Sequence, residues 1–297
     1  MPALRATLLL LLVIVPSTIV HIVPLLAVTL LKALLPSARL RRACNPLLTG
    51  LAESWIGINN LLFDHCVHTR LDLHEQASLQ RDGHYLVFAN HQSWVDILVL
   101  QRVLHGHVPF LKFFLKAELI WVPVIGLAWW ALDFPFMKRG KGRGARHNDL
   151  RTTREACEKF KRIPTTVMNF VEGTRFTPAK HAAQASPYRH LLKPKIGGLG
   201  IALATMGEQF EALLDVTIVY PHGAPTFWHL LCGGIDAVTV RVRQCAIPPD
   251  LLGGDPMGDK AYRQRIGTWV EAQWAEKDAL IDSLLQADAQ ARPPAPH

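Results

Sequence analysis

Apolar residues are concentrated at the start of the chain and form shorter runs over the rest. No Lys, Arg, Asp or Glu interrupts residues 6–31, a stretch longer than the roughly 20 residues with which a helix crosses the hydrocarbon core of a bilayer. This pattern predicts one membrane helix. Pro16, His21 and Pro24 interrupt the segment, so a kinked or re-entrant helix in one leaflet is the alternative. A cleaved signal peptide is disfavoured, because its apolar region usually has only about 7 to 15 residues.

Basic residues flank this segment unequally. Arg5 precedes it, whereas Lys32, Arg39, Arg41 and Arg42 follow it. The positive-inside rule therefore predicts that the following chain lies on the cytoplasmic side. We expect residues 1–42 to anchor the protein in the cytoplasmic (inner) membrane, with the remaining domain facing the cytoplasm. The five cysteines include no C-x-x-C pair, which fits a reducing compartment.

After a helical connector predicted over residues 43–78, short apolar runs bounded by turn residues alternate with longer helical patterns. Strands are predicted at residues 84–89, 108–114, 133–137, 165–171, 214–220 and 237–242. Helices are predicted at residues 94–104, 148–161 and 197–206. Strands that alternate with helices indicate one α/β domain over residues 79–250, around a largely parallel or mixed sheet.

Two other segments have recognisable patterns. Residues 251–297 are predicted to form an amphipathic helix and a disordered tail, the tail being the Ala- and Pro-rich residues 286–297. The helical spacing is carried by Tyr262, Ile266, Trp269, Val270, Trp274 and Ile281. The Trp-rich stretch 119–132 is too short to span a bilayer. It forms either a buried helix or an interfacial patch, since Trp favours the headgroup boundary.

Composition and charge narrow the class of protein. The chain has 297 residues, 49% hydrophobic and 19% charged, which is too apolar for a disordered protein and long enough to bury a core. A net charge of +8 and a pI near 9.4 suggest an anionic partner, and a mean hydropathy of +0.16 is high for a soluble enzyme. Membrane lipid, nucleic acid or a phosphorylated substrate would each fit.

The most informative polar pattern is N-H-Q-S-W-V-D at residues 90–96, where a predicted strand ends and a helix begins. His91 and Asp96 can meet only if His91 precedes the helix and Asp96 lies in its first turn. In one interpretation Ser93 caps the helix and Asp96 only completes a capping box. In the other, Asp96 orients His91 as a general base. The chain has no G-x-S-x-G elbow, so the substrate should supply the attacking hydroxyl.

A second polar pattern, F-V-E-G-T-R at residues 170–175, also follows a predicted strand. Arg175 is placed to bind a phosphate with two hydrogen bonds, and Glu172 would hold Arg175 or a substrate hydroxyl. Alternatively, the two form a surface ion pair on a turn at Gly173. Basic residues over 138–146 and at Lys193 and Lys195 would contact a phosphate or headgroup, or form solvated loops.

Four sequence blocks, N-H-Q-S-W-V-D, D-F-P-F-M-K-R, F-V-E-G-T-R and V-T-I-V-Y-P, occur in this order over about residues 80–225. In these blocks the chain resembles the PlsC-type 1-acylglycerol-3-phosphate acyltransferases of the lysophospholipid acyltransferase superfamily. The second block, with H-L-L-K-P-K at residues 190–195, is most similar to the YihG and lysocardiolipin acyltransferase branch. Asp133 and Pro135 stand where many members have Gly and a plain apolar residue.

The resemblance implies transfer of a fatty acyl group from acyl-CoA or acyl carrier protein to a lysophospholipid, most often 1-acylglycerol-3-phosphate. It makes His91 the catalytic base and Asp96 its partner. The substrate-binding residues that it and the basic clusters indicate are Arg139, Glu172, Gly173, Thr174, Arg175, Lys193, Lys195 and Pro221.

Three further expectations complete this reading. No metal or cofactor is expected beyond the acyl donor as co-substrate, because no His/Cys cluster has ligand spacing. Other acceptors, such as lysocardiolipin, lysophosphatidylglycerol or a lyso-aminolipid, are the alternative. A membrane-tethered nucleic-acid-binding protein is the competing class, but aromatic residues do not interleave with the basic loop after Phe136.

Overall fold

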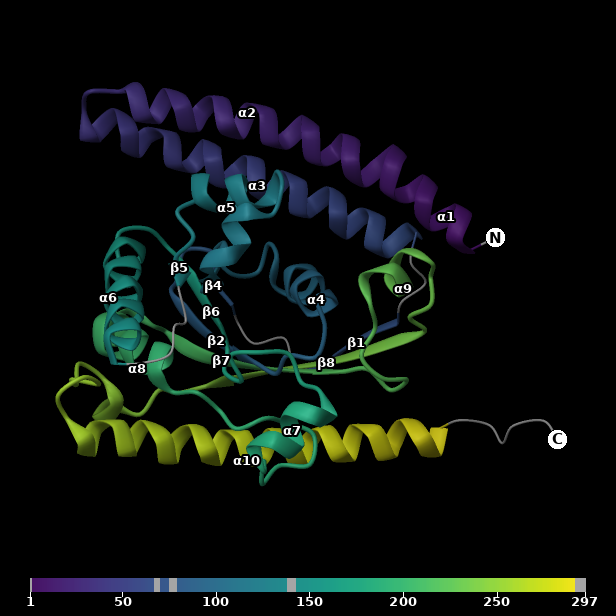
Figure 1. The fold of residues 1–297 in the computed structure, drawn as a ribbon, viewed down its shortest axis with the longest axis vertical. Helices are drawn as coiled ribbons and strands as arrows, with labels where there is room; N and C mark the ends of the chain where they lie inside the picture. Colours follow the sequence, from purple (N-terminus) through teal and green to yellow (C-terminus); the bar gives the residue numbers. More distant parts are fainter. Residues whose placement is uncertain (1, 67–69, 75–78, 138–142, 292–297) are drawn as a thin grey trace.

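The computed structural model describes residues 2–66, 70–74, 79–137 and 143–291. A helical hairpin forms its upper layer in Figure 1. The first arm is α1 (Pro2–Leu9), a short π-helix (Leu10–Ile14) and α2 (Val15–Leu34), and the second arm is α3 (Ala38–Cys66). Trp55 Nε1 donates a hydrogen bond of 3.2 Å to Thr18 Oγ1 across the hairpin. The predicted anchor and connector are therefore two arms of one unit.

The first arm lies along the domain. Residues 2–34 form one helical stretch that is long and apolar enough to cross a membrane. However, Lys32 near its end pairs with Asp133 at 3.1 Å, and α1 at its start contacts α9 (Phe227–Leu231). Both ends therefore contact the same domain; a spanning helix and a helix lying in one leaflet both stay predictions. Asp133, a departure from the common second block, serves this docking contact.

A six-stranded mixed sheet forms the centre of the molecule, as predicted. Its order is β1 (Arg70–His74), β8 (Ala237–Cys245), β7 (Ala212–Val219), β2 (Tyr85–Ala89), β6 (Thr166–Phe170) and β3 (Leu111–Phe113). The last four are parallel; β8 is antiparallel to β7 and parallel to β1.

Three strand predictions differ from the structure. The strand predicted at 108–114 shortens to β3, three residues long. β1 falls within the predicted helical connector, where R-L-D-L-H alternates polar and apolar residues with the period of a strand. The strand predicted at 133–137 shrinks to β5 (Phe136–Met137). It pairs with β4 (Leu115–Lys116) outside the main sheet.

Alternating side chains of β2 supply two cores. Tyr85, Val87 and Ala89 face the hairpin, α4 (Val95–Leu104) and α5 (Ile125–Ala131), whereas Leu86 and Phe88 face α6 (Arg143–Phe160), α8 (Gly197–Met206) and α10 (Lys260–Ala291). All five β2 residues are buried, as expected for a central parallel strand covered on both faces. The end of β2 is thereby fixed between two helical layers (Figure 1).

The last helix is longer than predicted. α10 runs to Ala291, so residues 286–291 are helical rather than part of a disordered tail, and residues 292–297 lie outside the described part. Leu284 and Leu285 pack against the core, and the first proline of the tail is Pro293. Apolar contact and the absence of an earlier helix breaker explain the extension.

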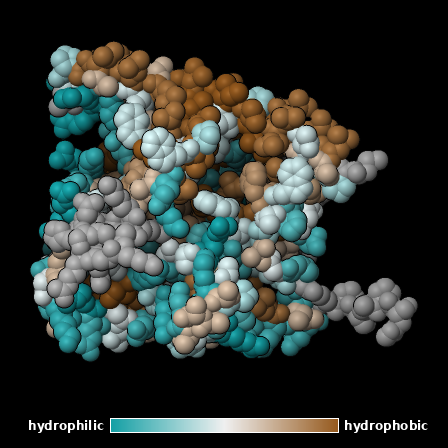
Figure 2. Space-filling view, in the orientation of Figure 1, coloured by the Kyte–Doolittle hydropathy of each residue, from teal (hydrophilic) through white to brown (hydrophobic). Residues whose placement is uncertain are grey.

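The Trp-rich stretch is divided between the two predicted roles. It contains a 3₁₀ helix (Ala117–Trp121) and α5. Ala131 and Leu132 belong to the core, while Trp121 and Trp130 are exposed. Figure 2 shows that apolar residues gather over the N-terminal helices.

Candidate active site

His91 and Asp96 meet at the end of β2. The strand ends at Ala89 and α4 begins at Val95, so His91 precedes the helix and Asp96 lies in its first turn. His91 Nδ1 is 2.8 Å from Asp96 Oδ2. Asp96 is buried and the His91 side chain is 13% exposed. The carboxylate can therefore hold one imidazole tautomer, leaving Nε2 as the nitrogen available to a substrate.

Asp96 also closes the turn before the helix. Its Oδ2 accepts the backbone N–H groups of Gln92 at 2.6 Å and Ser93 at 2.9 Å, and Ser93 Oγ accepts the N–H of Val95 at 3.1 Å. The capping interpretation and the orienting interpretation thus describe the same carboxylate. Capping fixes the position from which Asp96 contacts His91.

Tyr220 is a site residue that the sequence did not reveal. Its hydroxyl donates a 2.7 Å hydrogen bond to Asp96 Oδ1. Burial, followed by the charge of Asp96 and this hydrogen bond, raises the pKa of Tyr220 well above its usual value, so the hydroxyl stays a donor. Tyr220 follows β7, which pairs with β2. An aromatic residue at the end of a neighbouring parallel strand was the available signal.

The His91 ring is held from its face as well. It stacks on Phe170, with ring centroids 3.9 Å apart and planes 14° apart. The carbonyl of His91 accepts the N–H of Phe176 at 2.7 Å. The last residue of β6 therefore holds the ring of His91, and the loop after β6 holds its backbone.

Glu172 joins the turn at His91 to the segment at Leu192 through two hydrogen bonds. Its Oε1 accepts the N–H of His91 at 2.7 Å, and its Oε2 accepts the N–H of Leu192 at 2.9 Å. The side chain is fully buried. Burial raises the Glu172 pKa to about 7, although both backbone donors favour the charged form. With both oxygens engaged, Glu172 positions His91; contact with a substrate hydroxyl stays a prediction.

The turn after Glu172 brings cations together. Gly173 has φ +67°, and a Cβ there would lie 3.0 Å from Lys195 Cδ, so glycine permits the turn and the close approach. The Arg175 guanidinium lies over the Trp94 ring at 5.2 Å from its centroid. Lys180, which the sequence reading missed, donates to Thr174 Oγ1 at 2.8 Å and to the carbonyl of Arg175 at 2.9 Å.

The remaining predicted site residues are less clearly placed. Lys193 is exposed, and its backbone N–H is bonded to Gln184 at 3.1 Å. Pro221 directly follows Tyr220 and is half-buried. Arg139 lies outside the described residues. For all three, substrate contact stays a prediction.

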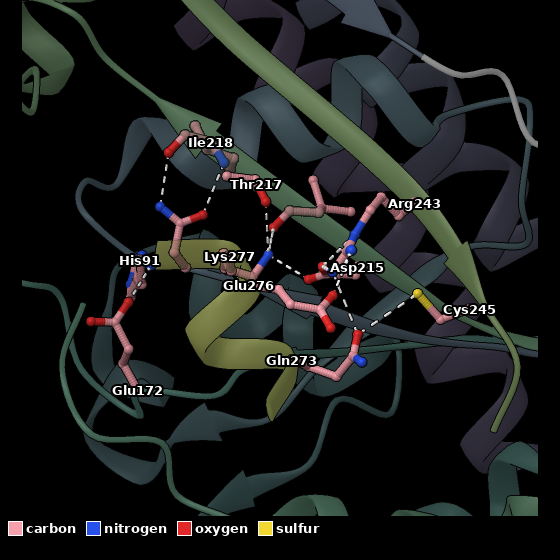
Figure 3. A network of polar contacts seen from close by, with 12 residues as sticks. His91, Glu172, Asp215, Thr217, Ile218, Arg243, Cys245, Gln273, Glu276 and Lys277 are labelled. Atoms are coloured by element: carbon pink, nitrogen blue, oxygen red, sulfur yellow. Dashed lines mark hydrogen bonds and ion pairs between the residues drawn. The ribbon is translucent and has the colours of Figure 1, made fainter. Parts of the chain in front are cut away.

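Polar contacts clamp the strands behind the site. The Asn90 side chain donates to the carbonyl of Ile218 and accepts its N–H, both at 2.8 Å. Lys277 reaches from α10 to β7 (Figure 3), where Nζ lies 2.5 Å from Asp215 Oδ1 and donates to the carbonyl of Val216 at 2.7 Å. Burial lowers the Lys277 pKa, against the attraction of Asp215. The clamp ties α10 to the strand that carries Tyr220.

An apolar cavity of about 370 Å³, here the inner cavity, is lined by Trp94 and Ile97, which flank Asp96 in the sequence. It lies among α2, α3, α4 and α5, and its lining includes Leu25, Ala52, Trp94, Phe113 and Ala128. The Phe113 and Phe170 rings are 6.3 Å apart, so stacked aromatic rings connect this cavity to His91.

A second apolar cavity of about 450 Å³, here the outer cavity, lies between the hairpin and α9. Its lining includes Ile19, Asn59, Phe63, Leu230 and Leu231.

Comparisons with known proteins identify the family of the chain. Residues 70–221 match the family model described as Acyltransferase. The chain is 31% identical over 220 residues to "1-acyl-sn-glycerol-3-phosphate acyltransferase 2" of Arabidopsis thaliana, covering 69% of this chain and 53% of that one. It is 28% identical over 229 residues to the human "1-acyl-sn-glycerol-3-phosphate acyltransferase gamma", covering 71% and 57%. The chain thus spans about half the length of these relatives.

A solved structure confirms the predicted fold. The 1-acyl-sn-glycerophosphate acyltransferase PlsC from Thermotoga maritima superposes with a TM-score of 0.52 over 99% of both chains, at 18% identity. At this identity the likeness concerns the fold alone. The similarity to the YihG branch stays a prediction.

Proposed function

Because the chain belongs to the acyltransferase family, we propose that it transfers a fatty acyl group from acyl-CoA or acyl carrier protein to the free hydroxyl of a lysophospholipid. The relatives' names favour 1-acylglycerol-3-phosphate as the acceptor, and the product is then phosphatidic acid. The observation that carries the proposal is the buried Asp96, which fixes His91 in a turn whose Trp94 lines an apolar cavity.

His91 acts as the general base. Since Nδ1 contacts Asp96 at 2.8 Å, Nε2 removes the proton from the acceptor hydroxyl. The Asp96 carboxylate stabilises the imidazolium that forms. Tyr220 and two backbone N–H groups keep that carboxylate in place. A positioned base of this kind contributes about 10² to 10⁴-fold to the rate.

The acyl group is then transferred from the thioester to the acceptor oxygen. The acceptor oxygen bonds to the thioester carbonyl carbon, and the tetrahedral intermediate collapses with cleavage of the C–S bond. The leaving thiolate takes the proton back from His91 Nε2, so His91 ends neutral and an ester and a thiol are released. Neither a metal nor a prosthetic group has a step in this scheme.

Cations near His91 account for an acceptor with a phosphate. Arg175 is exposed, lies over the Trp94 ring and presents a guanidinium that can bind phosphate with two hydrogen bonds. Lys195 lies against the same turn. The donor's acyl chain would occupy the inner cavity, whose wall is almost entirely apolar.

The apolar face of the hairpin supports membrane association. Its exposed residues include Leu8, Leu12, Ile19 and Val23, a contiguous surface that water would disfavour (Figure 2). We place this face in the cytoplasmic leaflet, with the α/β domain on the cytoplasmic side. Membrane lipid and a phosphorylated substrate are then the anionic partners that the positive net charge suggests, and no nucleic acid is needed to explain it.

The deciding experiment gives the membrane-bound protein one labelled acyl-CoA and a set of acceptors: lysophosphatidic acid, lysophosphatidylglycerol, lysocardiolipin, a lyso-aminolipid and monoacylglycerol. We expect the phosphorylated acceptors to exceed monoacylglycerol at least tenfold, because one lost charge-assisted contact costs about 1.5 to 3 kcal/mol. Preference for monoacylglycerol would refute the phosphate site. Preference for another lysophospholipid would change only the acceptor. Replacing acyl-CoA by acyl carrier protein identifies the donor.

A further inference from the structure

The proposed reaction brings two fatty acyl chains to one site, and the structure has two apolar cavities beside it. We propose that the inner cavity holds the chain of the donor, and that the outer cavity is a separate site for the chain that the lysophospholipid acceptor already carries. This inference rests on the proposed function. Its new element is a protein site for the acceptor's chain, which would otherwise remain among membrane lipids.

The cavities share one wall. Residues that line both include Thr18, Trp55 and Leu98. Trp55 Nε1 donates to Thr18 Oγ1 at 3.2 Å, which holds the indole between α2 and α3. Leu98 comes from α4, the helix that begins just after His91. Two chains directed from the catalytic end would therefore pass on opposite sides of this wall.

The exposure of side chains on the first helical arm indicates which cavity the acceptor chain can reach. In the first helical arm, Ile22 and Leu25 line the inner cavity and are 9% and 3% exposed. Val15 and Ile19 line the outer cavity and are 40% and 52% exposed, on the apolar face assigned to the membrane. A lysophospholipid resident in the bilayer can reach the outer cavity laterally. The donor chain then takes the inner cavity, whose lining, unlike that of the outer cavity, includes Trp94 of the catalytic turn.

The outer cavity also has a connection to the catalytic strand ends. Phe227, at the start of α9, lines both cavities. The loop before α9 is tied to the catalytic turn, because the Ser93 hydroxyl donates to the carbonyl of Pro225. An acceptor whose phosphate lies at Arg175 can thus extend its chain toward α9 while its hydroxyl stays at His91.

Two matched substitutions on α3 test the assignment. Ala52 lines only the inner cavity and Asn59 only the outer one, and the two lie on one helix face about two turns apart. Ala52→Phe and Asn59→Phe each insert one ring. Each variant is assayed with a series of acyl-CoA chain lengths at fixed acceptor, and with a series of lysophosphatidic acid chain lengths at fixed donor.

We expect Ala52→Phe to shorten the preferred donor chain and leave the acceptor series unchanged. Asn59→Phe should do the reverse, with the KM for long acceptors rising roughly fourfold for each methylene group excluded. A donor shift caused by Asn59→Phe, or no shift in the acceptor series, would overturn the proposal. Wild-type protein without acyl transfer to any acceptor would instead refute the proposed function.

A measurement on the unaltered protein covers the case in which a variant fails to fold. Lysophosphatidic acid with a photoreactive diazirine near the end of its chain is crosslinked in vesicles containing the wild-type enzyme. Label on peptides that contain Ile19, Asn59 or Leu231 supports the outer site. Label confined to Leu25 or Ala128, or to lipid, contradicts it.

Discussion

Two parts of the molecule meet at His91 and are held in different ways. The ends of β2, β6 and β7 are joined by buried polar contacts from Asn90, Asp96, Glu172 and Lys277. The hairpin docks mainly through apolar side chains, with few polar contacts such as Trp55 to Thr18 and Lys32 to Asp133. Directional contacts suit atoms that must stay within tenths of an ångström, whereas apolar contacts tolerate chains of several lengths.

The largest loss should come from the catalytic pair itself. His91→Ala should lower kcat by about 10² to 10⁴-fold while the protein stays folded and membrane-bound. Asp96→Asn should be severely impaired as well, because an amide cannot stabilise the imidazolium. Turnover and vesicle binding of purified variants are the measurements, with His190→Ala as the control. Near-normal turnover of Asp96→Asn would leave Asp96 only its capping role, since Asn is a good cap.

The next largest effect should come from Arg175, the proposed phosphate ligand at the strand ends. Arg175→Ala should raise the acceptor KM at least tenfold and change the donor KM far less, because one guanidinium contact to phosphate is lost. Arg175→Lys should recover only part of the affinity, since an ammonium cannot make the paired hydrogen bonds. Initial rates with each substrate varied provide the comparison, and Arg189→Ala is the control. Equal damage to both KM values would argue against a phosphate contact.

Tyr220→Phe removes one hydroxyl from the buried polar contacts around Asp96. We expect kcat to fall roughly tenfold with little change in either KM, because Asp96 loses a buried donor. Tyr262→Phe is the matched control: its hydroxyl is also buried, but it donates to the carbonyl of Leu251 at 2.8 Å. If both variants lowered kcat equally, the effect would be one of stability.

Glu172 should make stability depend on pH. Burial raises its pKa from 4.5 to about 7 in the folded protein, so the folded state binds more protons than the unfolded state between these values. The free energy of unfolding should therefore fall as pH rises from about 4.5 to 7, by roughly 3 kcal/mol in total from this group. Glu172→Gln should lose this component. Denaturation in detergent at several pH values compares the slopes, and equal slopes would contradict the assignment.

The smallest effect on chemistry should come from the hairpin's outer face. Leu12 is 68% exposed, and Leu12→Asp should weaken vesicle binding at least tenfold because a carboxylate resists the hydrocarbon region. Turnover on detergent-dispersed substrates should stay near the wild-type value. Gln290→Asp on α10 is the control. Unchanged vesicle sedimentation of Leu12→Asp would mean that this face does not enter the membrane.

Much of the fold followed from local pattern. Short apolar runs bounded by turn residues located β2, β6 and β7, and helical patterns located α4 and, through the Tyr262 to Ile281 stripe, α10. The meeting of His91 and Asp96 was also predictable, because it needs only a strand end and the first turn of the next helix. β1 was missed since a five-residue edge strand carries too few positions to outweigh a helical neighbourhood.

The sequence by itself determined which residues are candidates for catalysis. It also determined that residues 6–31 are apolar enough to favour a membrane or a protein core. Only the tertiary structure decided that the Tyr220 hydroxyl binds Asp96 and that Glu172 accepts the backbone N–H of His91. It also decided that the helical hairpin packs along the domain and lines two cavities. The reason is physical. These contacts join residues whose separation along the chain says nothing of their distance, so they depend on which strands pair and which helices pack together.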